Sequence, residues 1–307
     1  MTFGSFGRRG GPGDFDARLA RVEQLLAAPG GGGGAAGPLA LLASVLRFQT
    51  GRVAVPAVVA AAGAAAAGAE LRLAAGRFPL LDLAAAVAPI AAEIPLAVAA
   101  LTGAPGGPGV ELPEPLTAAG RALAGQALAG GVSPEREALV EAWLDDVAGP
   151  EAVLGFWVRV AAAPILEAAR VPVVTPARDD WTGSACPACG GLPQASVIAE
   201  ESGEFMGGSP RSLVCGRCAG MWGFPRAICT WCGEADPRRL PSFVPEERKA
   251  VRIDGCETCG NYVKTFDLRE AGGPDLVPLV DDVATVSLDL WAHDQGLARP
   301  LVSFAGV

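Results

Sequence analysis

All eight cysteines of this 307-residue chain occur in four pairs, and two residues separate the cysteines of each pair. A tight turn at this spacing aims both sulfur atoms at one point, and a tetrahedral ion needs two such turns. Four turns therefore predict two four-sulfur metal sites. The predicted ligands are Cys186, Cys189, Cys215, Cys218, Cys229, Cys232, Cys256 and Cys259.

Glycine follows three of the four pairs, at Gly190, Gly233 and Gly260. At this place a glycine lets the chain bend back with a positive φ and point backbone N–H groups at the sulfurs. Disulfides suit a secreted chain, and no signal-peptide pattern precedes the pairs. A redox motif of the thioredoxin type needs one pair within a strand and helix pattern, which is not found around these four. Metal binding accounts for all of them.

Sequence neighbours are the natural partners, because one turn of a ribbon leads into a short hairpin that returns to the second turn. The first two pairs are then expected to share one ion, and the last two pairs another. An interleaved pairing is the alternative. The predicted hairpins join residues 195–198 to 212–214 and 242–244 to 250–253, with turns at 207–210 and 245–247.

The charge of the chain argues against a nucleic acid partner. Its formal net charge is -9, and residues 181–307 hold 11 basic and 16 acidic side chains, a net charge of -5. Metal ribbons that bind nucleic acid need a basic face to release counterions from phosphate. We therefore expect no binding to DNA or RNA.

The region before the cysteines has the pattern of helices separated by glycine and proline. Residues 1–13 are expected to form a flexible tail, in which Arg8-Arg9 is not followed by the apolar stretch of a targeting signal. An all-helical domain is predicted over residues 14–178, with Asp14 as the first N-cap and a break at 30–34. Further helices are predicted at 39–47, 53–73, 80–101, 116–128, 134–147 and 151–169.

This helical domain shows neither a membrane span nor an active site. Residues 53–67 lack charges, but the stretch is too short to span a membrane, so we expect no membrane insertion. The domain contains no histidine and no cysteine. Its carboxylates are expected on solvated helix faces and ends or in turns, which predicts that the protein is not an enzyme. Asp145, Asp146 and Glu151 are such carboxylates, and Asp179-Asp180, just before Trp181, is expected to be a boundary turn.

After the last cysteine pair, residues 262–266 predict a closing strand and residues 275–296 predict a C-terminal helix. The apolar spacing of this helix places its acidic residues, Asp281, Asp282 and Asp289, on the solvated face. His293 is the only histidine. It is expected to be a polar residue near the helix end, because eight thiolates already complete two tetrahedral sites.

Trp222, Phe224 and Trp231 lie close to the second and third cysteine pairs. They are expected to shield the sulfurs from water and to pack the two ribbons together. The alternative is that one of them, with Arg226, is exposed and anchors a protein partner.

The order and spacing of these motifs resemble the formate dehydrogenase accessory protein family, FdhE. The resemblance covers roughly residues 181–296, whereas the helical half is similar only in general pattern, and the glycine-rich tail departs from the family. It rests on the segments Cys186-Pro-Ala-Cys-Gly-Gly-Leu-Pro, Cys215-Gly-Arg-Cys with Trp222 following, Cys229-Thr-Trp-Cys, Cys256-Glu-Thr-Cys-Gly-Asn-Tyr-Val-Lys and Val280-Asp-Asp-Val-Ala-Thr-Val-Ser-Leu-Asp.

The resemblance implies two tandem rubredoxin-like modules, at residues 182–226 and 227–270, after the helical domain. It also implies that the two bound ions are iron, although tetrahedral thiolate sites suit zinc as well. The protein is then expected to be a cytoplasmic accessory factor that contacts the catalytic subunit of formate dehydrogenase before that enzyme is finished. The alternatives are a rubredoxin-type electron-transfer protein and a structural zinc-ribbon protein that binds nucleic acid or protein. The oligomeric state is not predicted.

Overall fold

The computed structural model describes residues 10–103, 112–125, 133–145, 152–177, 180–199, 211–270 and 275–306. Within these ranges the first half of the chain is helical, and most of the second half forms a sheet. The helices are α1 Phe15–Ala27, α2 Ala36–Val53, α3 Pro56–Ala66, α4 Ala69–Ala74, α5 Val87–Thr102, α6 Glu114–Gly125, α7 Pro134–Asp145 and α8 Ala152–Arg170.

Local sequence signals explain where several of these helices begin and end. Helix α1 begins after Asp14, whose side chain accepts a hydrogen bond of 3.2 Å from the backbone N–H of Ala17. Helix α7 begins at Pro134, as expected. Helix α2 is longer than the predicted 39–47. The predicted helix at 53–73 is two helices, because Gly68 between them adopts a φ of 75°.

Helix α8 is the centre of the helical part, where it packs against α2, α3, α5, α6 and α7. Trp157 on this helix is completely buried. A Cβ atom at Gly120 of α6 would lie 2.6 Å from the Trp157 ring, so only glycine lets the two helices approach this closely.

Three helical stretches are long and apolar enough to cross a membrane by length and composition alone, namely Pro56–Ala74, Ala84–Thr102 and Ala152–Arg170. The first extends beyond the stretch 53–67 considered in the sequence, but it contains the break at Gly68. The third is α8, of which 61% is buried inside the molecule. Its apolar character is therefore explained by its place in the protein core.

The strands of both ribbons form a single six-stranded sheet with the order β3-β2-β1-β6-β5-β4. Both predicted hairpins are present, β1 with β2 and β4 with β5. The ribbons join where β1 and β6 run parallel, with Ser196 opposite Thr265. The strands are β1 Pro193–Ile198, β2 Arg211–Cys215, β3 Met221–Phe224, β4 Ser242–Phe243, β5 Val251–Gly255 and β6 Tyr262–Asp267. The predicted fold class is confirmed, but the continuous sheet was not predicted.

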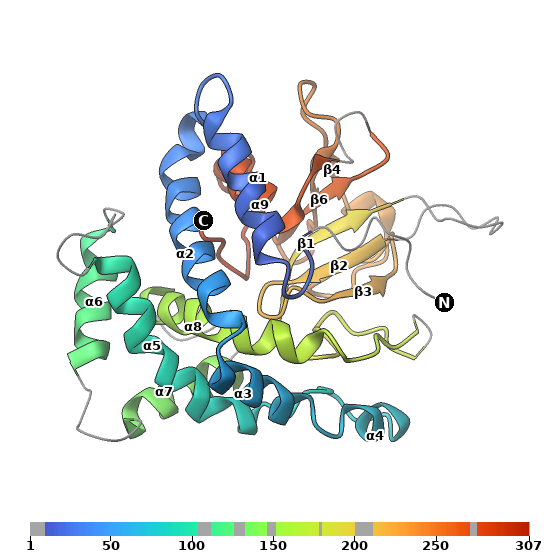
Figure 1. Cartoon of the computed structure of the whole chain (residues 1–307). Coiled ribbons are helices and arrows are strands. Elements are labelled where there is room, and N and C mark those ends of the chain that lie inside the picture. Colours follow the sequence, from blue (N-terminus) through green and yellow to red (C-terminus); the bar gives the residue numbers. More distant parts are fainter. Residues whose placement is uncertain are drawn as a thin grey trace.

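The first ribbon shares a hydrophobic core with the helical part. Trp157 and Leu166 of α8 belong to the same buried cluster as Cys186, Cys215 and Trp222. The backbone N–H groups of residues 80 and 81, ahead of α5, donate hydrogen bonds of 2.9 Å to the carbonyl oxygens of residues 187 and 188. Figure 1 shows the sheet beside α8, with the remaining helices grouped around them. The first cysteine module is thus part of the main core.

The C-terminal helix expected over 275–296 is divided at Thr285 into α9 Pro278–Ala284 and α10 Val286–Asp294. Its acidic residues were expected on a solvated face, and this expectation was wrong: the exposed fractions of Asp281, Asp282 and Asp289 are 3%, 1% and 1%. Helix α9, which carries Asp281 and Asp282, lies between α1 and α2 on one side and β1 on the other. Asp289 lies on α10 and is buried against Tyr262 and Lys264 of β6.

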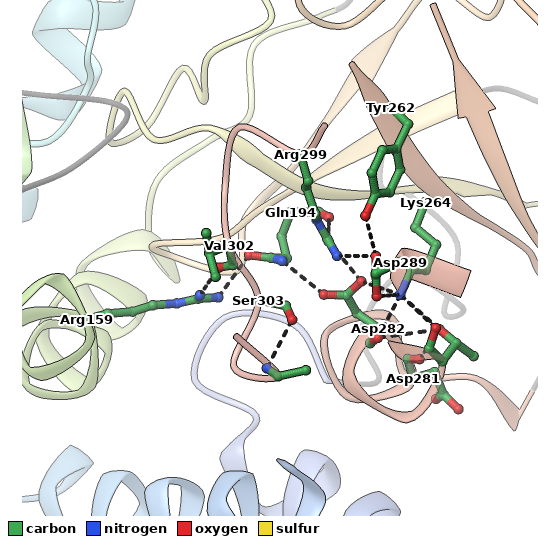
Figure 2. Close-up of polar contacts among 12 residues, drawn as sticks. Arg159, Gln194, Tyr262, Lys264, Asp281, Asp282, Asp289, Arg299, Val302 and Ser303 are labelled. Carbon is green, nitrogen blue, oxygen red and sulfur yellow. Dashed lines mark hydrogen bonds and ion pairs between the residues drawn. The ribbon is translucent and has the colours of Figure 1, made fainter. Parts of the chain in front are cut away.

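Two of these aspartates belong to a buried ionic cluster with Lys264 and Arg299 (Figure 2). The Lys264 Nζ atom lies 2.6 Å from Asp289 Oδ2 and 3.2 Å from Asp282 Oδ1. Arg299 lies 2.8 Å from Asp282 and 3.0 Å from Asp289. Two cations therefore balance two carboxylates, which is the condition under which buried charges are tolerated.

Hydrogen bonds extend this cluster to strands β1 and β6 and to helix α8 (Figure 2). The Tyr262 hydroxyl of β6 donates to Asp289 over 2.7 Å, and the Gln194 amide of β1 donates to Asp282 over 2.9 Å. Arg159 of α8 in turn donates to the Gln194 amide oxygen over 3.0 Å. The network links the helical part, both ribbons and the C-terminal segment.

The remaining expectations concern the N-terminal tail, the acidic residues of the helical part and one hairpin turn. Of the expected flexible tail, residues 10–13 are packed: Gly10 is buried, and the Gly13 N–H donates to Glu167 over 2.8 Å. Asp145 is exposed and Asp180 lies in a turn, as expected. The expectations for Arg8-Arg9, Asp146, Glu151, Asp179 and the turn at 207–210 lie outside the described residues.

Candidate metal centres

The eight cysteines form two groups, and each group unites the two pairs that are neighbours in the sequence. A tetrahedral ion with metal–sulfur distances of about 2.3 Å holds its sulfur atoms about 3.8 Å apart. The shortest Sγ–Sγ separations agree: 3.7 Å for Cys186 and Cys218, 3.5 Å for Cys189 and Cys215, 3.8 Å for Cys229 and Cys259, and 3.6 Å for Cys232 and Cys256. Each group therefore fits one tetrahedral ion, which agrees with the predicted pairing of cysteine pairs that are neighbours in the sequence.

The backbone closes all four turns in the same way. The N–H of the first cysteine donates to the carbonyl oxygen five residues on, as from Cys186 to Gly191 over 2.8 Å. Gly190, Gly233 and Gly260 have φ values of 70°, 77° and 69°, which confirms the role expected of these glycines. In two turns a backbone N–H also points at a sulfur, from residue 217 to Cys215 and from residue 231 to Cys229.

The first centre, formed by Cys186, Cys189, Cys215 and Cys218, is enclosed by protein, and each of its cysteines is at most 2% exposed. Arg217 closes it on the side of helix α7. Its guanidinium donates to the carbonyl oxygens of Trp143 and Leu144 and lies 4.6 Å from the centroid of the Trp143 ring. The sequence analysis did not single out Arg217, because its partners come from a helix more than 70 residues earlier.

The second centre, formed by Cys229, Cys232, Cys256 and Cys259, is open on one side. Cys229 and Cys256 are buried, but Cys259 is half-buried and Cys232 is exposed. Trp231 beside them is also half-buried, and its indole N–H donates to the Tyr262 carbonyl oxygen over 3.2 Å. Solvent and other molecules can therefore reach the second centre directly.

The electrostatics of the first group favour a bound cation. Hydrogen bonding among the neighbouring thiols, first with Cys186, raises the pKa of Cys189 and of Cys218 well above the usual range of a cysteine. Burial acts to raise the pKa of Cys215, but hydrogen bonds from the same thiols outweigh it, so that its pKa is well below that range. Four thiols this close together can all lose their protons only when a cation is bound, because each negative thiolate disfavours deprotonation of its neighbours. The donor set, four sulfurs in tetrahedral reach, suits zinc or iron.

The expected shielding role is confirmed for two of the three aromatic residues. Trp222 and Phe224 are 1% and 3% exposed, and the Trp222 indole N–H donates to the Gly183 carbonyl oxygen over 3.2 Å. Arg226, near Trp231, is exposed. His293 is exposed at the end of α10 and belongs to neither cysteine group, as expected.

Because the two centres differ in exposure, they are expected to release their ions at different rates. A metallochromic chelator mixed with the loaded protein should remove one equivalent rapidly from the second centre and the other at least about tenfold more slowly. Absorbance of the chelator–metal complex measures both phases. Replacing Cys232 by serine should abolish the fast phase, and release of both ions at one rate would contradict the assignment.

Comparisons with known proteins relate this chain to FdhE proteins. Residues 229–304 match the family model described as FdhE, C-terminal domain. A protein FdhE homolog of Aquifex aeolicus is 36% identical over 126 residues, which are 41% of this chain and 43% of that protein. A protein FdhE homolog of Edwardsiella ictaluri is 33% identical over 171 residues, 54% of this chain and 52% of that protein. The matches thus span about half or less of these relatives.

The fold is similar over nearly the whole chain to the crystal structure of the FdhE protein from Pseudomonas aeruginosa. The TM-score is 0.65 at 22% sequence identity, with 95% of each chain covered. This likeness includes the helical half, in which the sequence alone showed only a general pattern. Family model, curated relatives and fold agree, and the resemblance of this chain to the FdhE family is confirmed.

Proposed function

We propose that the protein is an accessory factor for the maturation of formate dehydrogenase and that it binds the catalytic subunit of that enzyme. The family resemblance supports the connection with formate dehydrogenase. The role is that of a helper without catalysis of its own. It acts in the cytoplasm, without nucleic acid partners and without insertion into a membrane.

The observation that carries this proposal is the unequal exposure of the two cysteine groups. The first is enclosed between the ribbon and the helical part, where an ion serves the fold. The second presents Cys232 and half-buried Trp231 at the surface of the second ribbon. A centre that only stabilised its ribbon has no need of this exposure, so we assign the surface around it to the partner.

The ions proposed for both centres are iron. The thiolate donors alone suit zinc as well as iron, and the choice of iron follows the family resemblance. An iron ion in the exposed centre can change oxidation state, whereas zinc has no redox chemistry. With iron bound by Cys229, Cys232, Cys256 and Cys259, the exposed centre would supply a group that responds to oxygen or to reductant.

An affinity capture experiment tests the proposal. The tagged full-length chain is expressed in cells that make formate dehydrogenase, captured under anaerobic conditions, and analysed by mass spectrometry for the catalytic subunit. We expect recovery of the subunit by the wild-type chain and a loss of most of it when Cys229 and Cys232 are replaced by serine. Consistent failure of the wild-type chain, loaded with both ions, to recover the subunit would count against the function.

The exposed centre also favours a second candidate, a rubredoxin-type electron-transfer protein. That function requires a reversible change of visible absorbance on reduction and turnover with a reductase. A colourless protein loaded with zinc at both centres would exclude it and leave the accessory role intact.

A further inference from the structure

Both turns of the first centre close with a glycine that the backbone conformation does not require. The residue whose carbonyl oxygen accepts the closing hydrogen bond is Gly191 in the first turn and Gly220 in the second. In the third and fourth turns this residue is Glu234 and Asn261. Neither Gly191 nor Gly220 has a φ in the left-handed region, where glycine is favoured. Another requirement must therefore account for these two glycines.

The requirement at Gly220 is space for the side chain of Arg170, the last residue of helix α8. A Cβ atom at Gly220 would lie 2.7 Å from the Arg170 Nε atom and 3.2 Å from the Cys218 Sγ atom. Any larger residue at this point would displace the arginine. Because these two distances limit the separation of the nitrogen and the sulfur, the guanidinium lies within about 6 Å of a ligand of the first centre.

Gly191 makes room for a second arginine in the same way. A Cβ atom at Gly191 would lie 2.9 Å from the Arg217 Cδ atom and 3.0 Å from the Cys215 Sγ atom. The Arg217 backbone N–H also points at this sulfur, over 3.3 Å. The Arg217 guanidinium reaches helix α7, where it donates to two carbonyl oxygens. Arg217 therefore directs its charged end to α7, whereas the Arg170 guanidinium lies beside the metal ligands.

Arg170 is a buried cation, 8% exposed, whose hydrogen-bond partners are uncharged. Among the residues that the structure describes, its guanidinium donates to the Val173 carbonyl oxygen and to the Thr175 hydroxyl. Glu167, one turn earlier on α8, is paired with Arg18. Since a buried charge is stable only near an opposite charge, the thiolates of the first centre are the counter-charge within reach of Arg170.

The charge of the first centre depends on the oxidation state of its ion. Four thiolates around a divalent ion carry two net negative charges, whereas around a trivalent ion they carry one. Burial alone favours the less charged, trivalent state, but a nearby cation stabilises the more negative, divalent state. We infer that Arg170 is the counter-charge of the first centre and that it stabilises the ion there in the divalent state.

The second centre is built differently at the equivalent position. The closing residue of its third turn is Glu234, whose carboxylate accepts a hydrogen bond from the Thr258 hydroxyl in the fourth turn. Cys232 of this centre is exposed, so water solvates a change of charge there. At this position the first centre makes room for a cation, and the second places an anion. A change at Arg170 is therefore expected to affect the first centre alone.

A redox titration of the full-length chain tests the inference. The chain is loaded with iron at both centres under anaerobic conditions, and visible absorbance follows the one-electron steps between ferric and ferrous iron. Dithionite supplies the electrons, and ferricyanide removes them. The variants are Arg170→Met, which removes the charge, and Arg170→Lys, which keeps it. Circular dichroism and a metal content of two ions per chain verify that both variants are folded.

We expect Arg170→Met to move one of the two iron steps and to leave the other, which is the internal control, unchanged. The ratio of ferrous to ferric iron in that step should fall about tenfold or more, which is about 59 mV to lower potential for one electron. Arg170→Lys should keep the wild-type value. A shift of both steps, a shift of neither, or an equal shift in Arg170→Lys overturns the inference.

Arg170→Gln is the second neutral variant, because a change at a buried position can prevent folding. If both neutral variants fail to fold and Arg170→Lys folds with the wild-type steps, the positive charge is required and the inference stands. If Arg170→Lys also fails to fold, the role of Arg170 is its packing, and the inference is overturned.

The inference rests on the iron proposed for both centres and not on the partner. Zinc at both centres of the purified chain would refute the proposed iron, whereas the chain reloaded with iron still shows whether Arg170 shifts the first step. Failure to recover the catalytic subunit from cells would refute the accessory function and leave the two iron steps as they are.

Discussion

Replacing Cys186 and Cys189 by serine is expected to prevent the whole chain from folding, not only the first ribbon. The first centre is part of the core that contains helix α8, and residues 80 and 81 bond to the turn between these two cysteines. Metal binding at structural thiolate sites contributes about 10–16 kcal/mol, which is comparable to the entire stability of a domain, about 5–15 kcal/mol. Circular dichroism and soluble yield measure the effect.

The matched variant replaces Cys229 and Cys232 by serine in the second centre. This centre is open, and its cysteines contribute little to the main core. We expect the two cysteine turns of the second centre to lose their structure and the chain to lose one ion, while strand β6, which the Lys264 cluster holds, and the helical signal remain. Equal damage from the two double substitutions would contradict the division of the centres into a structural and an exposed one.

Replacing Lys264 by methionine is expected to lower the free energy of unfolding by about 3–5 kcal/mol. The Lys264 ammonium is fully buried and donates to Asp289 and Thr285, so its loss leaves two buried carboxylates with Arg299 alone. Lys249→Met, at an exposed lysine, is the control and should change the stability by less than about 0.5 kcal/mol. Denaturant titration followed by circular dichroism compares them.

The two carboxylates of this cluster depend on pH in opposite senses, because burial raises the pKa of Asp289. Burial acts to raise the pKa of Asp282, but Arg299 and Lys264 outweigh it, so that its pKa is lower than usual. The contribution of Asp282 to stability is therefore complete above the ordinary pKa of an aspartate and is lost as the pH falls through the lower, folded value.

A Lys264→Met protein that is as stable as wild type at neutral pH would contradict the Lys264 prediction. It would show that the buried ion cluster does not hold the helical part, the sheet and the C-terminal segment together.

Spacing in the sequence was enough to predict the two cysteine groups, because both the turns and the hairpins are local. The glycines at 190, 233 and 260 adopt the expected positive φ for the same reason. What spacing could not reveal were contacts between distant segments. The parallel pairing of β1 with β6 and the bonds of Arg217 to α7 depend on residues about 70 positions apart.

The acidic residues of the C-terminal helices show a second limit. Helical periodicity assigns polar residues to solvent, and it has no means of detecting a buried partner such as Lys264. The two halves of the ion cluster lie on different elements, β6 and α9–α10, and only the fold brings them together. Periodicity was therefore right about Val280 and Val283, which are buried, but wrong about Leu290, which is 53% exposed, and about the acidic residues.

Metal analysis of anaerobically purified protein, with a visible spectrum, tests the central claim most directly. We expect two transition-metal ions per folded chain, one at each cysteine group, and the absorbance of iron bound by four thiolates. A chain that is free of bound metal but fully folded, with the helical signal and thermal stability of the native protein, would contradict the account.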